Sequence, residues 1–354
     1  MTQGRIRILV VEDSPTARTF LAEIFGAMPD MEVVGTAADG IEAIRAARDL
    51  RPDVVTMDVY MPRMDGLEAT RQIMRDCPVP IVVISSMGDG EVTASFRALD
   101  AGAVAFVRRP RGIDESEATA EDIGQMIQTV RLMSEVRVVR RTGAPPRRAG
   151  SMAVPSQLSL GRQDVRTILV GASTGGPTAI IDLMVPLPTS GGPPVLIVQH
   201  IAAGFVDGLV EWLAKATGHN IHVAADGEPL SCGVTYVAPD GKHMGIAADR
   251  IRLSDAALEH GVRPSVSFLF RSALENYGGA VAAALLSGMG KDGAHELRAL
   301  KLRGATTFAQ DAGSAIVNGM PGEAVRLDAA QYVLPPTEIG RAIAMLVGRG
   351  PAGQ

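Results

Sequence analysis

The sequence has few cysteines, few aromatic residues and no long apolar run. Its 354 residues include two cysteines, Cys77 and Cys232, whose separation matches neither a disulfide framework nor a zinc-binding spacing. This scarcity favours a reducing compartment, and we expect a cytoplasmic protein. No segment approaches the roughly 20 consecutive apolar residues of a membrane-spanning helix, and the chain opens without a secretory signal pattern. We therefore expect neither membrane insertion nor secretion.

A strong excess of one charge is also missing. The formal net charge of −5 provides no general attraction for nucleic acid or an anionic membrane. The one basic stretch, residues 136–163, mixes arginines with prolines and small residues and contains no aromatic ring that could stack on a base. We predict a flexible linker over residues 139–163 and no binding to nucleic acid.

What the chain does contain is typical of a globular protein. A hydrophobic fraction of 46% with 21% charged residues is ordinary for a folded chain, and the length predicts about two domains. In the N-terminal half, short apolar runs alternate with helical patterns, the last helix covering roughly residues 117–137. Strands are predicted at residues 8–11, 32–36, 54–57, 81–84 and 104–107. Such alternation predicts a parallel, doubly wound α/β sheet whose ligands lie at the carboxyl ends of the strands.

Acidic side chains collect at those strand ends. Glu12 and Asp13 follow the first predicted strand, Asp58 follows the third and Ser85 ends the fourth. Any single acid could be a helix cap or a solvated loop residue. Three carboxylates at one sheet edge repel one another unless a hard cation joins them, and oxygen ligands suit Mg²⁺. Such a site can transfer a phosphoryl group to one carboxylate.

Residues 5 to about 125 resemble a response-regulator receiver domain, most clearly in the segment MDVYMPRMDG at residues 57–66. The resemblance implies a flavodoxin-like fold and a histidine kinase as phosphodonor. It implies Mg²⁺ binding by Glu12, Asp13 and Asp58, phosphorylation of Asp58, a switch hydroxyl on Ser85 and a switch aromatic ring on Phe106.

One position departs from the receiver pattern. Arg109 precedes Pro110 where the family usually has a lysine. Arginine keeps the positive charge, but its planar fork differs from a compact ammonium group. Two hypotheses are open: Arg109 pairs with Asp58 or Glu12 and weakens the switch, or it replaces lysine with little effect.

The second half is organised around the segment RTILVGASTGGP at residues 166–177. An apolar strand at 168–170 is followed by glycines and a helical pattern at 178–185, which places Ser173 at a strand-to-helix turn. There, helix N–H groups can stabilise negative charge on a reacting oxygen, so Ser173 is a candidate nucleophile. Two alternatives are that Ser173 only caps the helix and that the glycines cradle a phosphate.

A base and an acid follow two other predicted strands. His200 ends the strand at 195–198, and Asp292 lies shortly after the strand at 281–286. Because such strand ends meet at one sheet edge, Ser173, His200 and Asp292 could act together, with histidine accepting the serine proton and aspartate orienting the ring. Their order along the chain differs from that of α/β-hydrolases.

Short strand signals at 232–239 and 245–253 predict a β-hairpin over the sheet.

Other residues compete for the roles of base and acid. The competitors are Asp311 as the acid, His295 as a neighbour of Asp292, and His219 with His222 at a metal-like spacing.

The second half resembles the catalytic domain of the chemotaxis protein-glutamate methylesterases, and the receiver, linker and esterase order matches that family. The matching segments are residues 171–176, 198–200, 236–239, 243–244, 263–266, 287–293 and 309–311. The resemblance implies a catalytic domain over residues 164–350 and an oxyanion donor in the backbone N–H of Met289. It also implies a methylated glutamate on the cytoplasmic domain of a chemoreceptor as substrate, glutamine deamidation as a second activity, and no cofactor for hydrolysis.

Two other classes of function compete with an esterase. A binding module that uses the Ser173 turn as a phosphate cradle would keep its affinity without His200. A transcription regulator would need a DNA-reading helix, and no basic helix-turn-helix pattern follows residue 163.

Overall fold

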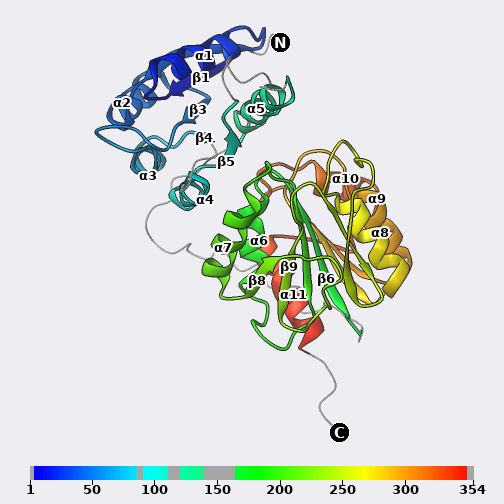
Figure 1. Ribbon diagram of the computed structural model, residues 1–354. Helices are drawn as coiled ribbons and strands as arrows, with labels where there is room; N and C mark the ends of the chain where they lie inside the picture. Colours follow the sequence, from blue (N-terminus) through cyan, green and yellow to red (C-terminus); the bar gives the residue numbers. More distant parts are fainter. Residues whose placement is uncertain (1–3, 86–90, 111–119, 137, 139–163, 349–354) are drawn as a thin grey trace. The chain divides into compact units, whose positions relative to one another are not determined.

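The computed structural model describes residues 4–85, 91–110, 120–136, 138 and 164–348 (Figure 1). The chain divides into two compact units, Met1–Ala149 and Gly150–Gln354, and each is described by itself. The predicted linker at 139–163 lies outside the described residues. Within the described residues, no helix combines the length and the apolar character that crossing a membrane requires.

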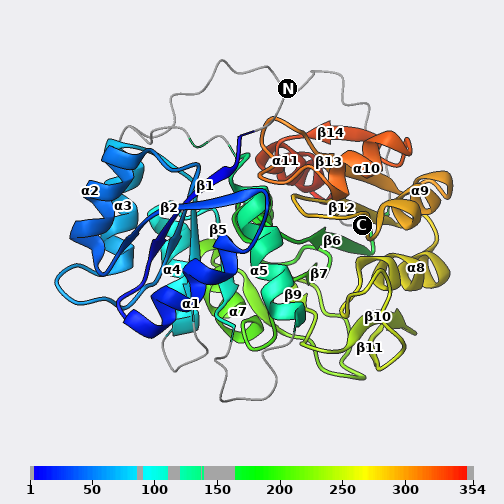
Figure 2. The same ribbon diagram turned by 90° about the horizontal axis from the view of Figure 1, so that it is seen from above.

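The N-terminal unit has a five-stranded parallel sheet in the order β2-β1-β3-β4-β5. The strands are β1 (Ile6–Val11), β2 (Met31–Ala37), β3 (Val54–Met57), β4 (Ile81–Ser85) and β5 (Ala105–Arg108). The helices are α1 (Pro15–Gly26), α2 (Gly40–Leu50), α3 (Gly66–Asp76), α4 (Glu91–Ala101) and α5 (Ala120–Met133). Helix α3 contacts both α2 and α4, and Figure 2 shows α1 and α5 on the other face of the sheet.

This architecture confirms the predicted doubly wound fold. The first helix begins as expected, because the Ser14 hydroxyl accepts a hydrogen bond from the N–H of Ala17 and Pro15 occupies the first turn. The last helix was predicted to continue to about residue 137. It ends at Met133, where Ser134 and Glu135 turn the chain.

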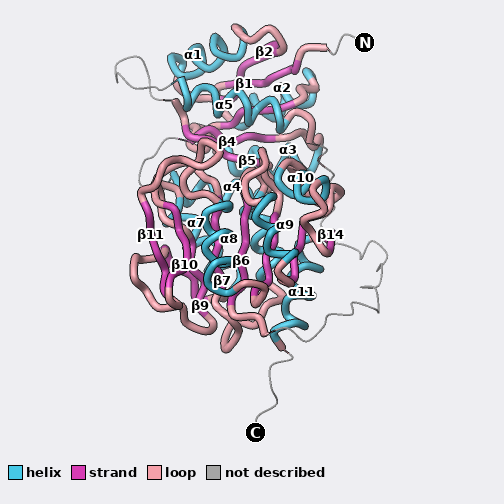
Figure 3. Tube along the Cα trace, turned by 90° about the vertical axis from the view of Figure 1, so that its right-hand side faces the viewer, coloured by secondary structure: helices cyan, strands magenta, loops and turns pink. Residues whose placement is uncertain are grey.

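The C-terminal unit contains a seven-stranded parallel sheet in the order β14-β13-β12-β6-β7-β9-β8. Its strands are β6 (Thr167–Ala172), β7 (Val195–Gln199), β8 (Asn220–Val223), β9 (Val234–Val237), β12 (Val281–Leu285), β13 (Thr306–Gln310) and β14 (Tyr332–Leu334). Its helices are α6 (Gly176–Met184), α7 (Val206–Thr217), α8 (Val266–Tyr277), α9 (Ala294–Leu302), α10 (Met320–Arg326) and α11 (Pro336–Val347). Figure 3 shows α8 and α9 crossing in front of the strands.

The parallel sheet and a separate hairpin confirm the predicted fold class, but the predicted hairpin strands were partly wrong. The hairpin consists of β10 (His243–Ala247) and β11 (Arg250–Ser254), which pair antiparallel. The preceding strand, β9, instead joins the main sheet between β7 and β8. A short apolar run carries no information about which partner it will pair with, so the pattern could not separate the two arrangements.

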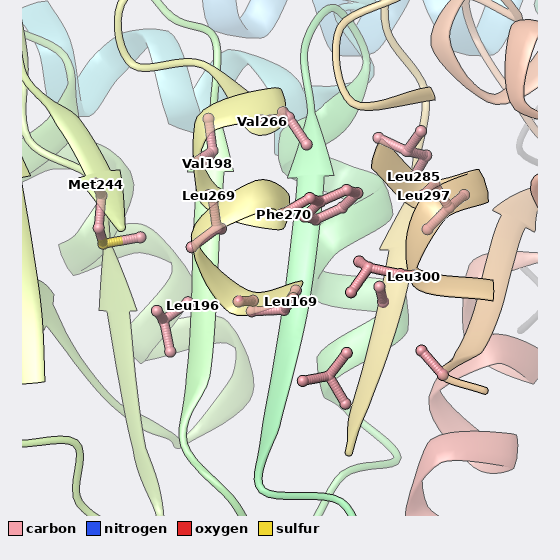
Figure 4. Close-up of a cluster of buried hydrophobic side chains, with 14 of the residues drawn as sticks. Leu169, Leu196, Val198, Met244, Val266, Leu269, Phe270, Leu285, Leu297 and Leu300 are labelled. Atoms are coloured by element: carbon pink, nitrogen blue, oxygen red, sulfur yellow. The ribbon is translucent and has the colours of Figure 1, made fainter. Parts of the chain in front are cut away.

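The core beside the site lies between α8 and the central strands. Leu269 and Phe270 on α8 are fully buried and belong to one cluster with Leu169 on β6 and Leu285 on β12. Figure 4 shows these side chains converging between the helix and the sheet. Burying side chains of this size contributes about 1.5–3 kcal/mol each, so this cluster fixes the start of α8 relative to the strand ends.

Strand β6 lies at the point where the strand order reverses. Its sequence neighbour β7 pairs on one side, and β12, which comes much later in the chain, pairs on the other. In open α/β sheets, this switch point is where the carboxyl ends of the strands form a crevice. The three predicted site residues follow these three strands.

Candidate active site

Ser173 lies at the turn between β6 and α6. Its N–H donates to the carbonyl of Ser287 (3.0 Å), which ties the turn to the end of β12. The residue is 9% exposed, and within the described residues its hydroxyl makes no hydrogen bond. Helix α6 is preceded by Gly175, in the left-handed conformation with φ of 76°. The alternative in which Ser173 is only the helix cap is therefore wrong.

The structure brings His200 and Asp292 into direct contact. Strand pairing places Ala172 opposite Gln199, so Ser173 and His200 follow adjacent strand ends. The Nε2 atom of His200 is 2.9 Å from Oδ2 of Asp292. This contact is the one predicted for a base and its orienting acid.

The carboxylate of Asp292 is held by the first turn of α8. Its Oδ2 accepts from the N–H of Val266 (2.6 Å), and its Oδ1 accepts from the N–H of Ser267 (2.9 Å) and the hydroxyl of Ser265 (2.8 Å). Burial opposes ionisation, but the hydrogen bond and charge of His200 and the backbone donors outweigh it and lower the pKa of Asp292 strongly. The helix dipole favours the same ionised form.

This contact defines the roles of the two ring nitrogens in His200. A carboxylate only accepts hydrogen bonds, so in the neutral ring Nε2 carries the hydrogen and Nδ1 is the bare nitrogen. Within the described residues Nδ1 makes no hydrogen bond, and it is the atom that remains to accept a proton. No hydrogen bond joins the Ser173 hydroxyl to His200 in this structure. Such contacts in free enzymes are often long and tighten when substrate binds.

The loop after β12 lies directly against Ser173. A side chain on Gly288 would place its Cβ 2.8 Å from the Cβ of Ser173, so glycine permits the close approach. The next residue, Met289, is 43% exposed, and its N–H makes no hydrogen bond to any described residue. A free N–H in the loop that packs on Ser173 is a candidate oxyanion donor.

The competing residues have other partners. Asp311 accepts hydrogen bonds from its own loop, from the N–H of Gly313 and the hydroxyl of Ser314. The ring of His219 is buried against the carbonyl of Met184, and burial lowers its pKa. Of the other two competitors, His222 is hydrogen-bonded to Glu228, and His295 is exposed on α9.

A second site lies in the N-terminal unit, at the carboxyl edge of its sheet. Ligand oxygens of Glu12, Asp13 and Asp58 lie within 4.8 Å of one another, an arrangement of hard oxygen donors that fits a divalent cation such as Mg²⁺. Glu12 is fully buried, and this burial together with the neighbouring Asp58 raises its pKa to about 7.

Arg109 makes ion pairs with two of these acids. One guanidinium nitrogen, Nη2, lies 2.7 Å from Oε2 of Glu12 and 3.0 Å from Oδ1 of Asp58. The pairing considered in the sequence analysis is therefore confirmed, and it involves both acids. The Nε atom of Arg109 is buried without a hydrogen-bond partner among the described residues, so the guanidinium group does not use all of its hydrogen-bond donors in this position.

The two predicted switch residues lie on β4 and β5. Ser85 is buried at the end of β4, and its carbonyl accepts from the N–H of Arg109 (2.7 Å). The half-buried ring of Phe106 packs edge to face on Phe96, with ring centroids 5.0 Å apart. Strand β4 pairs directly with β3, which Asp58 follows, and β5 is the next strand beyond it.

Two buried residues of the site had no role in the sequence analysis. Ser265 caps α8 and bonds Asp292, and Gln199 bonds the backbone of the Ser173 turn. A serine immediately before an apolar helical pattern is a recognisable cap signal. Nothing local in the sequence indicated that this cap lies beside Asp292.

Comparison with known families and proteins identifies both units. Residues 168–343 match the CheB methylesterase family and residues 8–121 match the response regulator receiver domain family. The chain is 48% identical over 350 residues to a protein-glutamate methylesterase/protein-glutamine glutaminase of Nitrosospira multiformis, covering 97% of both chains. A protein of the same description from Syntrophus aciditrophicus is 44% identical over 348 residues, covering 97% of this chain and 99% of its own.

The chain is also similar to a solved structure. The CheB methylesterase catalytic domain of Thermotoga maritima is 33% identical, with a TM-score of 0.49, and covers 52% of this chain and 99% of its own.

Proposed function

This chain belongs to the CheB methylesterase family and carries an N-terminal receiver domain, and from this premise we propose that it hydrolyses methylated glutamates of chemoreceptors under the control of phosphorylation. The products are glutamate and methanol, and glutamine side chains are deamidated at the same site. The observation that carries the proposal is the contact between His200 and Asp292, at the strand end adjacent to the turn that carries Ser173.

In the proposed mechanism the hydroxyl oxygen of Ser173 attacks the ester carbonyl while Nδ1 of His200 accepts the hydroxyl proton. The carbonyl electrons move onto oxygen, and the N–H of Met289 stabilises the resulting oxyanion. Collapse breaks the ester bond, and His200 returns the proton to the leaving methanol. A water molecule, deprotonated by His200, then attacks the acyl-enzyme and releases glutamate with Ser173 restored. A glutamine substrate follows the same path with ammonia as the leaving group.

Asp292 has two roles in this sequence of steps. It orients the His200 ring through Nε2, and its negative charge stabilises the imidazolium that forms when Nδ1 accepts a proton. The three donors from residues 265–267 keep the carboxylate ionised and fixed in place. Hydrolysis needs no cofactor in this scheme, because every proton transfer is assigned to His200.

We propose a receiver domain at residues 5–125, a linker at 139–163 and a catalytic domain at 164–350. In the receiver, Glu12, Asp13 and Asp58 would hold Mg²⁺, which shields charge on the incoming phosphoryl group. Asp58 accepts the phosphoryl group from a histidine kinase. Ser85 and Arg109 then contact the phosphoryl oxygens. The ring of Phe106 changes its packing when Asp58 is phosphorylated.

The receiver contacts yield a prediction for Arg109. To reach the phosphoryl oxygens, Arg109 must leave its ion pairs with Glu12 and Asp58, and its bulky planar guanidinium is harder to reorient in this site than the compact ammonium of a lysine. We expect Arg109→Lys to show a severalfold larger activation of the esterase by a small-molecule phosphodonor than the wild type. Phosphorylation of Asp58 itself should occur in both proteins. Equal activation of wild type and Arg109→Lys would show that arginine simply replaces lysine.

The direct test of the proposed function is methanol release from chemoreceptor membranes that carry radiolabelled methyl groups. The full-length chain should release methanol, and the release should increase with a phosphodonor. A pure binding module would retain the receptor membranes without releasing methanol, and that outcome would reject the esterase assignment.

A further inference from the structure

Gln199 joins the backbone of the nucleophile to that of the base. It is the last residue of β7 and is only 4% exposed. Its Nε2 donates to the carbonyl of Ser173 (2.7 Å) and to the carbonyl of His200 (2.8 Å). Both partners are carbonyl oxygens, which only accept, so the amide orientation is fixed by its contacts. One side-chain NH₂ group therefore bridges two strand ends.

The Ser173 turn is shaped to receive this carboxamide. The Ser173 carbonyl also accepts from the N–H of Gly176 (2.8 Å), so Gln199 completes its pair of acceptor sites. A Cβ on Gly176 would overlap the Oε1 atom of Gln199. That Oε1 is buried without a hydrogen-bond partner among the described residues, which is a cost to stability. A buried polar group kept at such a cost needs a compensating role.

We propose that Gln199 is a positioning residue for hydrolysis: its carboxamide fixes the Ser173 turn relative to His200, and so sets the approach of the hydroxyl to Nδ1. The proposal rests on the assignment of Ser173 and His200 as nucleophile and base. Those two side chains make no hydrogen bond with each other in this structure, so their relative position depends on the backbone that carries them. Misplacement of reacting groups by about 1 Å can reduce a rate on the order of 100-fold.

A matched control exists on the same two strands. At the opposite ends of β6 and β7, the buried hydroxyl of Thr167 donates to the carbonyl of Pro194 (3.0 Å). Thr167→Val removes one buried side-chain hydrogen bond between these strands far from the site, whereas Gln199→Met removes two hydrogen bonds beside the site. Both variants should lose stability, but only the second should slow the chemistry.

The experiment compares full-length wild type, Gln199→Met and Thr167→Val. Methanol release from methylated receptor membranes gives kcat and KM, and labelling by a fluorophosphonate, located by mass spectrometry, reports the reactivity of Ser173. For Gln199→Met we expect kcat and the labelling rate to fall about tenfold or more with little change in KM. For Thr167→Val we expect both rates to stay within about twofold of wild type.

A folded Gln199→Met protein that reacts as fast as Thr167→Val would overturn the proposal. Failure of the proposed function is a different result, because the wild type itself would then not be labelled at Ser173. If Gln199→Met does not fold, Gln199→Glu decides the question, since it keeps the size of the side chain and replaces the donating NH₂ group with an oxygen. A slow Gln199→Glu protein supports the proposal, and one as fast as wild type contradicts it.

Discussion

Replacing Ser173 with alanine is expected to abolish ester hydrolysis while leaving the protein folded. Loss of a serine nucleophile costs on the order of 10⁵- to 10⁶-fold in kcat where it acts with a histidine base. The hydroxyl makes no hydrogen bond among the described residues and does not cap α6, so its removal should change the free energy of unfolding by less than about 0.5 kcal/mol.

Methanol release and thermal unfolding of the same Ser173→Ala preparation measure the two effects. Phosphorylation of Asp58 serves as the internal control, because the receiver is unchanged and should accept phosphate at the wild-type rate. Substantial methanol release by the folded variant would remove Ser173 from the mechanism.

After Ser173→Ala, Asp292→Asn should cause the largest loss of esterase activity, and it should also lower the stability of the fold. The amide keeps the size of the carboxylate but not its charge, so it can no longer stabilise the imidazolium of His200. Its NH₂ group would also face donors from the start of α8. We expect a loss of about 10³- to 10⁴-fold in kcat, with a smaller change in KM.

The stability effect of Asp292→Asn should depend on pH in a defined direction. Because the folded-state pKa of Asp292 is lowered, its carboxylate stabilises the fold above the unfolded pKa of about 3.9, and the contribution is lost as pH falls toward the folded value. The variant should therefore be less stable than wild type by about 2 kcal/mol near pH 7. The difference should narrow below about pH 4, as urea unfolding at both pH values would show. A difference that is constant with pH would mean that the ionised carboxylate does not stabilise the fold.

The sequence predicted the strand-end residues well because one rule of topology governs them. In a parallel sheet, residues that follow adjacent strands meet at one edge, so Ser173, His200 and Asp292 could be grouped before any contact was known. The same rule grouped Glu12, Asp13 and Asp58, whose oxygens lie within 4.8 Å of one another.

Features that depend on packing between distant segments could not be predicted. The start of α8 lies beside Asp292 because its apolar side chains pack on β6 and β12, and nothing near Ser265 in the sequence indicates that neighbour. The assignment of Nε2 rather than Nδ1 to Asp292 depends on the same packing. Strand β9 was assigned to the hairpin for a related reason, since a short apolar run does not specify its pairing partner.

The most direct test of the central claim is to trap the acyl-enzyme with hydroxylamine. If one Ser173 acyl-enzyme carries both reactions, hydroxylamine should divert it to the glutamyl hydroxamate, and the ratio of hydroxamate to glutamate should be the same for methyl-ester and glutamine substrates. The ratio depends only on the shared intermediate, and Ser173→Ala corrects for uncatalysed attack by hydroxylamine. Equal ratios are the predicted result. Different ratios for the two substrates, or hydroxamate formation that survives Ser173→Ala, would contradict a single acyl-enzyme at Ser173.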